Sequence, residues 1–264
     1  MKTKAKSADI FALDRGFPMN IKPTQQSEKL TVGDSICAQN ASWSFNETDV
    51  AENFSEHARR SIPLYDEGHR LILDISDFFL PSSGRCCELG CSRGELLTQL
   101  ALRHKDKAIE WLGIDHSEAM IAEAKKQTSP TSITWLCEDI CTAPLQTADL
   151  IIAYYTVQFV PPRLRQDLID RLFQTLNWGG ALVLFEKVRG PDARFQDMLT
   201  SLYTDFKLGN GYSPEEIIHK SRSLKGILEP FSTQANMDML QRAGFKDITT
   251  VMKYLCFEGF LAIK

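Results

Sequence analysis

The sequence predicts a doubly wound α/β domain with a mostly parallel seven-stranded sheet and helices on both faces. From residue 85 to residue 185, short apolar runs alternate with amphipathic helical segments, a pattern typical of βαβ units. After residue 244, two further apolar runs at 247–254 and 257–263 follow each other closely, which indicates an antiparallel pair. This pair would close the parallel sheet.

Two helices are expected ahead of the sheet. Val50, Phe54 and Ala58 recur at helical spacing, and the Pro63 segment ends that helix. A second helix is predicted over residues 64–79 and is followed by a Pro-Ser-Ser-Gly turn.

Strands and helices then alternate along the chain. We expect strands at residues 85–89, 108–114, 131–136, 148–153 and 181–185. We expect helices at residues 95–103, 117–126, 163–176 and 237–242. The Asn-Trp-Gly-Gly segment at 177–180 predicts a turn before the fifth strand.

The pattern divides the chain into an arm and one domain. Residues 1–44 are polar and show no sustained period, so we expect a poorly ordered arm. Residues 45–264 form the predicted domain, and a helical insertion occupies about 188–230, where strand–helix alternation stops. A chain of 264 residues with 43% hydrophobic residues is sufficient for one large core.

The composition argues against several kinds of partner. A net charge of -4 disfavours direct nucleic-acid binding, because neutralising phosphates needs a basic face. No apolar run approaches the ~20 residues that a membrane helix needs. The seven cysteines are odd in number and several lie in apolar runs, which favours the reducing cytoplasm over a disulfide framework. Cys137 and Cys141 have no second pair to complete a zinc site, so no metal is expected.

Three acidic residues follow three consecutive predicted strands. Glu88 lies at the end of the first strand, before a loop bounded by Gly90 and Gly94, while Asp115 ends the second strand and Asp139 follows the third. Ligands of doubly wound sheets bind at the carboxyl ends of the strands. A carboxylate at Glu88 would repel the phosphates of a dinucleotide, but it suits a cationic ligand such as S-adenosylmethionine (SAM). Asp115 would accept hydrogen bonds from the ribose, and Asp139 would meet the adenine amino group.

These strand ends belong to segments with a recognisable pattern. Four of them resemble class I SAM-dependent methyltransferases, which have a Rossmann-like fold: Glu88-Leu-Gly-Cys-Ser-Arg-Gly94, Leu112-Gly-Ile-Asp-His-Ser-Glu-Ala-Met120, Glu138-Asp-Ile140 and Leu176-Asn-Trp-Gly-Gly-Ala-Leu-Val-Leu184. Four others are similar to the carboxy-SAM synthase family: Arg60-Ser-Ile-Pro-Leu-Tyr65, Val157-Gln-Phe159, Phe185-Glu-Lys187 and Asp205-Phe-Lys-Leu-Gly-Asn-Gly-Tyr-Ser213. That family uses prephenate to convert SAM into carboxy-SAM for tRNA modification.

The resemblance implies a set of SAM-binding residues and a homodimer whose interface is the insertion. The implied SAM contacts are Tyr65, Glu88, Gly90, Ser92, Asp115, His116, Asp139 and Ile140, with Tyr154 at a place where the family has asparagine. The family also has an arginine that grips the carboxylate of carboxy-SAM, and its place here holds Ser221.

That replacement changes the expected chemistry. A serine cannot form a bidentate salt bridge to a carboxylate. Arg222 is the next residue. Because successive residues of a helix are rotated by about 100°, its side chain would point in a different direction from that of residue 221. Arg222 lies three residues after His219, so the two can share one helical face, either in a substrate site or on a solvated surface. Further candidates for the substrate pocket are Tyr155, Gln158, Tyr203 and Tyr212, which could equally pack in the core.

Three hypotheses follow. The preferred one is a SAM-dependent methyltransferase that C-methylates a small α-keto acid, with Arg222 holding the carboxylate and His219 or Tyr155 removing the α-proton to give an enolate. The alternative is a carboxy-SAM synthase that uses prephenate and SAM. The third is a SAM-binding scaffold without catalytic activity.

Overall fold

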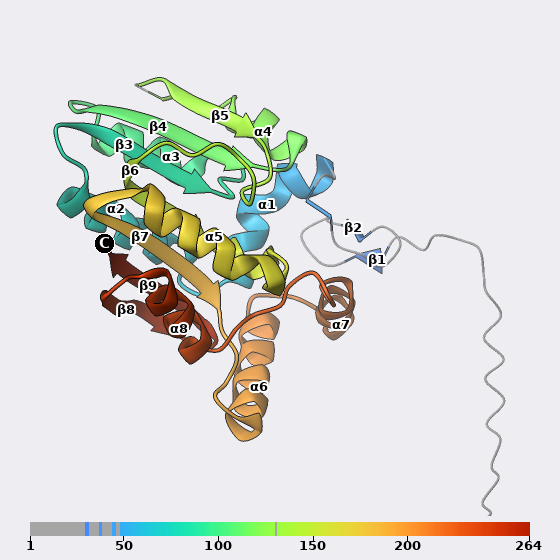
Figure 1. Cartoon of the computed structure of the whole chain (residues 1–264). Coiled ribbons are helices and arrows are strands. Elements are labelled where there is room, and N and C mark those ends of the chain that lie inside the picture. The colour runs from blue at the N-terminus through green and yellow to red at the C-terminus, as the bar shows by residue number, and fades with distance from the viewer. Residues whose placement is uncertain (1–29, 32–36, 39–43, 46–47, 130) are drawn as a thin grey trace, which may run out of the picture.

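The computed structural model describes residues 30–31, 37–38, 44–45, 48–129 and 131–264 (Figure 1). Their central feature is a seven-stranded sheet in the order β5-β4-β3-β6-β7-β9-β8. The strands are β3 (Ser83–Leu89), β4 (Ala108–Asp115), β5 (Ile133–Cys137), β6 (Ala148–Tyr154), β7 (Leu176–Lys187), β8 (Asp247–Tyr254) and β9 (Phe257–Ile263). Pairing is parallel from β5 to β7, and β9 lies antiparallel between β7 and β8. The predicted doubly wound sheet is therefore confirmed.

Helices cover both faces of the sheet. Figure 1 shows α5 and α8 on the near face, with α2 and α3 behind the strands. The helices are α1 (Thr48–Ser61), α2 (Tyr65–Phe79), α3 (Glu95–Arg103), α4 (Glu118–Ala124), α5 (Pro162–Thr175), α6 (Ala193–Gly209), α7 (Pro214–Ser223) and α8 (Thr233–Ala243), with a short 3-10 turn at Val157–Phe159. This arrangement encloses the central strands on both sides.

Alternate residues of the central strands supply two separate hydrophobic cores. In β6, Ile151 packs in the core beneath α5 and α8, whereas the neighbouring Leu150 and Ile152 pack in the core beneath α2 and α3. Because both faces are buried, the strands consist of nearly continuous apolar residues, as is typical of parallel sheets.

The insertion between β7 and α8 projects from the sheet as α6 and α7 (Figure 1). Helix α7 begins with a complete capping box: Ser213 Oγ accepts from the Glu216 amide at 3.2 Å, and Glu216 Oε2 accepts from the Ser213 amide at 2.9 Å. The capping box thus fixes the start of α7 at Pro214.

The turn predicted at 177–180 is wrong, because β7 begins at Leu176 and continues without a break. The extra length is accommodated by a register shift against β6 between Ala148 and Leu150, and Gly179 takes a φ of 77°. The chain end also pairs here, since the Lys264 amide donates to Gly180 O at 3.0 Å.

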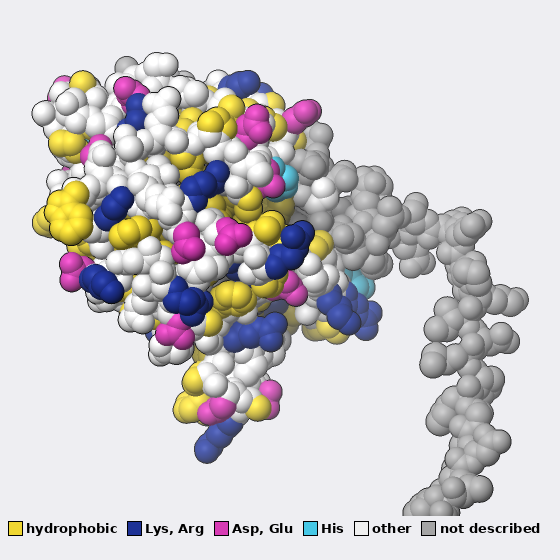
Figure 2. Space-filling model, viewed as in Figure 1, with side chains coloured by type: hydrophobic (Ala, Val, Ile, Leu, Met, Phe, Trp, Pro, Cys, Tyr) yellow, Lys and Arg dark blue, Asp and Glu magenta, His cyan; other side chains and the backbone are white. Residues whose placement is uncertain are grey.

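Much of the predicted arm lies outside the described residues. Its described part includes a two-residue antiparallel pair, β1 (Leu30–Thr31) with β2 (Cys37–Ala38). On the face shown in Figure 2, Lys and Arg side chains lie around the junction of α6 and α7, and both signs of charge are mixed elsewhere. No helix in the described part of the chain has the length and apolar composition to cross a membrane.

Candidate functional site

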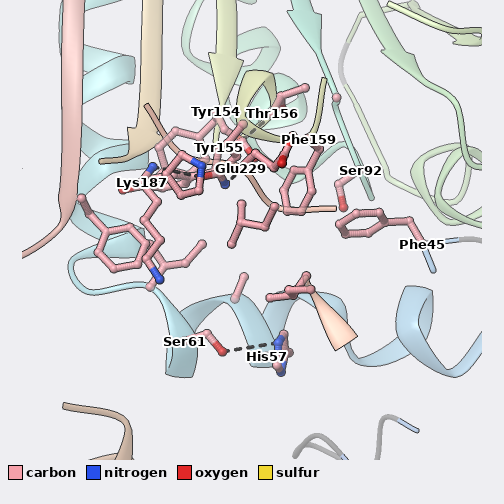
Figure 3. Close-up of a pocket in the computed structure, with 18 of the residues that line it drawn as sticks. Phe45, His57, Ser61, Ser92, Tyr154, Tyr155, Thr156, Phe159, Lys187 and Glu229 are labelled. Carbon is pink, nitrogen blue, oxygen red and sulfur yellow. Dashed lines mark hydrogen bonds between the residues drawn. The ribbon is translucent and has the colours of Figure 1, made fainter. Parts of the chain in front are cut away.

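A cavity of about 1250 Å³ opens at the carboxyl ends of the adjacent strands β4, β3, β6 and β7. Strand order reverses between β3 and β6, which is where doubly wound sheets bind their ligands. Helix α1 forms the opposite wall, as Figure 3 shows for His57 and Ser61. The cavity is larger than the roughly 300–1,000 Å³ typical of a single ligand site. It has room for two small molecules.

Glu88, at the end of β3, is a buried carboxylate that faces the cavity. Its side chain is 3% exposed, and Oε2 has no hydrogen-bond partner among the described residues. Burial raises the pKa of Glu88 well above its usual range, although the Leu97 amide acts in the opposite direction. A buried carboxylate with one unpartnered oxygen is stabilised by a cationic ligand, so Glu88 fits the amino group of SAM.

Asp115, at the end of β4, fixes the loop beside Glu88. One carboxylate oxygen accepts from the Ser92 amide and the other from the Ser117 amide, each at 2.9 Å. Burial raises the pKa of Asp115, while these two amides lower it. The amides of Ser92, Ser117 and His116 use at most three of the four lone pairs of the carboxylate, so it can still accept a hydrogen bond from a ribose.

Gly90 permits the tight approach of this loop to Thr156, which follows β6. It has a φ of 68°, and an ideal Cβ there would lie 2.9 Å from the Thr156 Cβ and closer to its Oγ1. Only glycine combines this backbone conformation with so little space.

The predicted adenine end of the site has an acidic side and an aromatic side. Asp139 is exposed, and its Oδ1 accepts from the Cys141 amide at 2.8 Å. Phe45 packs edge-on against Phe159, with ring centroids 5.0 Å apart, and its carbonyl accepts from Ser117 Oγ at 2.7 Å. Figure 3 shows Phe45 beside the loop of Ser92. No local pattern in the sequence pointed to Phe45, because the contact joins segments far apart in the chain.

The remaining predicted SAM residues surround the same cavity. Ile140 is buried and His116 is exposed, and both line it. Tyr154 is buried and its hydroxyl donates to the Tyr65 carbonyl at 2.7 Å, so it braces the start of α2. Tyr155 follows with a φ of 58°, a strained conformation for a tyrosine, and burial raises the pKa of its hydroxyl.

The predicted substrate residues Gln158, Tyr203 and Tyr212 also line the cavity, but each already has a hydrogen-bond partner. The Gln158 amide donates to Tyr155 O at 3.0 Å and accepts from the Lys187 backbone amide at 2.9 Å. Tyr203 Oη donates to the Ser61 carbonyl at 2.9 Å. Tyr212 Oη shares hydrogen bonds with Ser61 Oγ and with His57 Nδ1. The two tyrosines therefore tie the insertion to α1.

Helix α7 brings two of its predicted residues to the rim. Ser221 and Arg222 are exposed and line the cavity. His219 is not among the described residues that line it, so its predicted role in proton removal stays a prediction. Within the described chain, no cluster of three His, Cys, Asp or Glu residues could hold a metal ion.

Sequence reasoning missed two lysines of the inner wall. Lys187 ends β7 and Lys207 lies near the end of α6, and both line the cavity. Their ammonium nitrogens lie 4.2 Å and 4.6 Å from the ring centroid of Tyr203. The rule that located Glu88 at a strand end applies equally to Lys187.

Comparison with known proteins places this chain in a family. Residues 87–180 match the model of a methyltransferase domain. The carboxy-S-adenosyl-L-methionine synthase of Staphylococcus epidermidis is 36% identical over 222 residues, which cover 84% of this chain and 97% of that protein. A protein of the same name from Campylobacter jejuni is 36% identical over 217 residues, which cover 81% and 92%. The chain belongs to the carboxy-SAM synthase family.

Solved structures support the fold of this family member. The plantazolicin methyltransferase BpumL, in a complex with a desmethylPZN analog and SAH, aligns with a TM-score of 0.59 and 14% identity, over 83% of this chain and 95% of that chain. A possible histamine N-methyltransferase from Thermotoga maritima aligns with a TM-score of 0.52 and 18% identity, over 83% and 99%. The predicted resemblance is confirmed, and this carboxy-SAM synthase family member is a SAM-dependent transferase.

Proposed function

We propose that the protein transfers a carboxyl group to SAM and so forms carboxy-SAM, with prephenate or a similar α-keto acid as the donor. The observation that carries this proposal is the division of the cavity into an acidic and a basic side. Carboxylates lie at the ends of β3 and β4, whereas two lysines that form no salt bridge with a described residue lie at the end of β7 and on α6. A cation and an anion can therefore bind side by side.

The acidic side would hold SAM. Glu88 would pair with its amino group, Asp115 would accept from its ribose, and Phe45 would pack near its adenine. SAM supplies a sulfonium, which makes its methyl carbon electrophilic and its methyl hydrogens acidic. The enclosed site orients the second substrate and limits access of water.

The reaction balances without an added oxidant or metal. The bond between the prephenate ring and its carboxyl group breaks, and a new bond joins that carboxyl carbon to the SAM methyl carbon. The methyl group of SAM loses one proton, and the prephenate ring loses its hydroxyl group. The proton and the hydroxyl group together leave as water. The products are carboxy-SAM, phenylpyruvate and water.

C-methylation of an α-keto acid, the preferred sequence hypothesis, remains the second candidate. The exposed Ser221 at the rim favours it, because a serine cannot grip a carboxylate as arginine does. This route would leave the demethylated product of SAM and a methylated acid. The family relationship favours carboxyl transfer over it.

Incubation of the protein with SAM and prephenate separates these reactions. We expect mass spectrometry to show SAM enlarged by one carboxyl unit, together with an equal amount of phenylpyruvate. Formation of a methylated acid and demethylated SAM would replace the proposal with the second candidate. Binding of SAM without turnover of prephenate or any keto acid would favour the scaffold hypothesis.

We also propose that the protein acts as a cytoplasmic homodimer. The cysteines Cys86, Cys87, Cys91, Cys137, Cys141 and Cys256 are free thiols, which fits a reducing compartment. Phe195, Met198 and Leu202 lie on one stripe of α6 and are each about half exposed, which supports burial against a second copy.

A further inference from the structure

Two lysines approach one tyrosine ring from different elements of the fold. Lys187 comes from the end of β7 and Lys207 from α6, and their nitrogens lie 4.2 Å and 4.6 Å from the Tyr203 centroid. Lys187 is also 5.8 Å from the centroid of Phe257. Figure 3 shows the Lys187 side chain extending into the open space between the sheet edge and α1.

Neither lysine forms a salt bridge within the described part of the chain. The titratable groups that act on them are the thiol of Cys256, which lies in the turn between β8 and β9, and, for Lys207, the ammonium group of Lys187. Burial, and secondarily the charge of Lys187, lower the pKa of Lys207 to about 8. Burial also lowers the pKa of Lys187. Two neighbouring ammonium groups without a counter-ion are costly, and an anion bound between them would remove that cost.

Aromatic rings line the same region. The Tyr203 and Phe257 centroids are 5.2 Å apart, and the Tyr155 and Phe257 centroids are 5.7 Å apart. All of these residues line the cavity that contains Glu88. Flat apolar walls beside two cations suit an acid whose carboxylate is attached to an unsaturated ring or chain.

We propose, building on the function proposed above, that Lys187 and Lys207 form the subsite that binds a carboxylate of the small unsaturated acid. Tyr203 holds both ammonium groups beside its ring through cation–π contacts, and the neighbouring rings contact the hydrocarbon part of the acid. Carboxylate recognition thus belongs to the inner wall of the cavity, whereas Arg222 lies at its exposed rim.

The test measures acid binding without turnover. Phenylpyruvate and prephenate are titrated by calorimetry into protein saturated with demethylated SAM. We expect Lys187→Met and Lys207→Met each to weaken acid binding by roughly tenfold or more, because each removes a charge-assisted contact. Affinity for demethylated SAM should stay within about twofold of wild type. Lys246→Met, at an exposed lysine outside the cavity, is the matched control.

Proton uptake gives a second measurement that a purely structural role would not change. A carboxylate bound beside Lys207 raises the pKa of this lysine, so binding of the acid near pH 8 should be accompanied by proton uptake. The uptake is measured as a dependence of the heat of binding on the ionisation enthalpy of the buffer. Lys207→Arg should still bind the acid but lose this uptake, because arginine stays charged. If Lys187→Met fails to fold, the two Lys207 variants carry the test.

The possible outcomes separate this subsite from the proposed reaction. The proposed subsite is wrong if the wild-type protein binds neither acid. It is also wrong if both methionine variants bind the acids as tightly as wild type, and this holds even when carboxy-SAM is formed. The subsite stands and carboxyl transfer is wrong if the variants lose acid affinity while wild type makes a methylated acid.

Discussion

Gly68 of α2 and Tyr154 of β6 are complementary in shape. An ideal Cβ on Gly68 would lie 3.0 Å from Tyr154 Cζ and closer to its hydroxyl oxygen. That hydroxyl donates to the Tyr65 carbonyl at 2.7 Å, and Tyr65 itself lines the cavity. The absence of a side chain at Gly68 therefore makes room for the Tyr154 ring.

Gly68→Ala should lower the free energy of unfolding by about 1–3 kcal/mol, because the added methyl overpacks a buried contact. Urea unfolding measures the change. Gly209→Ala is the matched control: Gly209 lies in α6, nothing lies within 4 Å of its ideal Cβ, and alanine should be neutral or stabilising there.

Restoring the space should restore stability. Tyr154→Asn shortens the side chain, so Gly68→Ala should cost much less in that background than in wild type. Equal costs in the two backgrounds would show that Gly68 is not constrained by Tyr154.

Glu88→Gln should weaken binding of SAM and of its demethylated product by about 1.5–3 kcal/mol, because it removes the charge that pairs with the ligand's amino group. Calorimetry with the demethylated product measures the loss. Thermal stability of the ligand-free protein should not fall, since Glu88 Oε2 has no partner to lose. Glu110→Gln, at an exposed acid on β4, is the control and should bind like wild type. Unchanged affinity in Glu88→Gln would remove Glu88 from the site.

The acidic side of the site could be predicted because it depends only on the order of residues within short segments of the chain. Apolar runs locate the strands, and the residue after each run must lie at the same sheet edge as its neighbours. Glu88 and Asp115 needed no knowledge of distant contacts. Phe45 could not be found this way, since no pattern in the neighbouring sequence indicates that it packs against Phe159.

The basic side depends on how the insertion packs. Tyr203 and Lys207 are one turn apart in α6, but Lys187 approaches Tyr203 only because α6 packs beside the end of β7, which helical periodicity does not specify. The turn wrongly predicted at 177–180 has a similar cause. Its glycines indicate a break, but β6 pairs with Leu176 and Ala181 on either side of this segment, and the chain end at Lys264 pairs with Gly179 and Gly180.

Leu202→Glu should dissociate the proposed homodimer, because it places a charge in the apolar stripe of α6. Leu102→Glu is the same substitution at a leucine of similar exposure on α3, with side chains 50% and 57% exposed respectively. Light scattering after size-exclusion chromatography should give a monomer mass for Leu202→Glu and a dimer mass for Leu102→Glu. A wild-type monomer, or dissociation by both variants, would contradict an interface on this stripe.

We expect His69 to make the stability of the fold sensitive to acid. His69 is 3% exposed and packs against the rings of Tyr65 and Tyr154. Neither of its ring nitrogens is hydrogen-bonded to a described residue. Burial lowers its pKa from 6.5 to about 4, against the opposing charges of Glu95 and Asp66.

Because the folded state binds this proton less readily than the unfolded state, His69 costs no stability above pH 6.5. Stability is lost as the pH falls from 6.5 towards 4, by up to about 3 kcal/mol. Urea unfolding at pH 7.5 and pH 5 should show a smaller loss for His69→Leu than for wild type, because leucine has no proton to bind. Equal losses in the two proteins would mean that His69 is already protonated in the fold at pH 5.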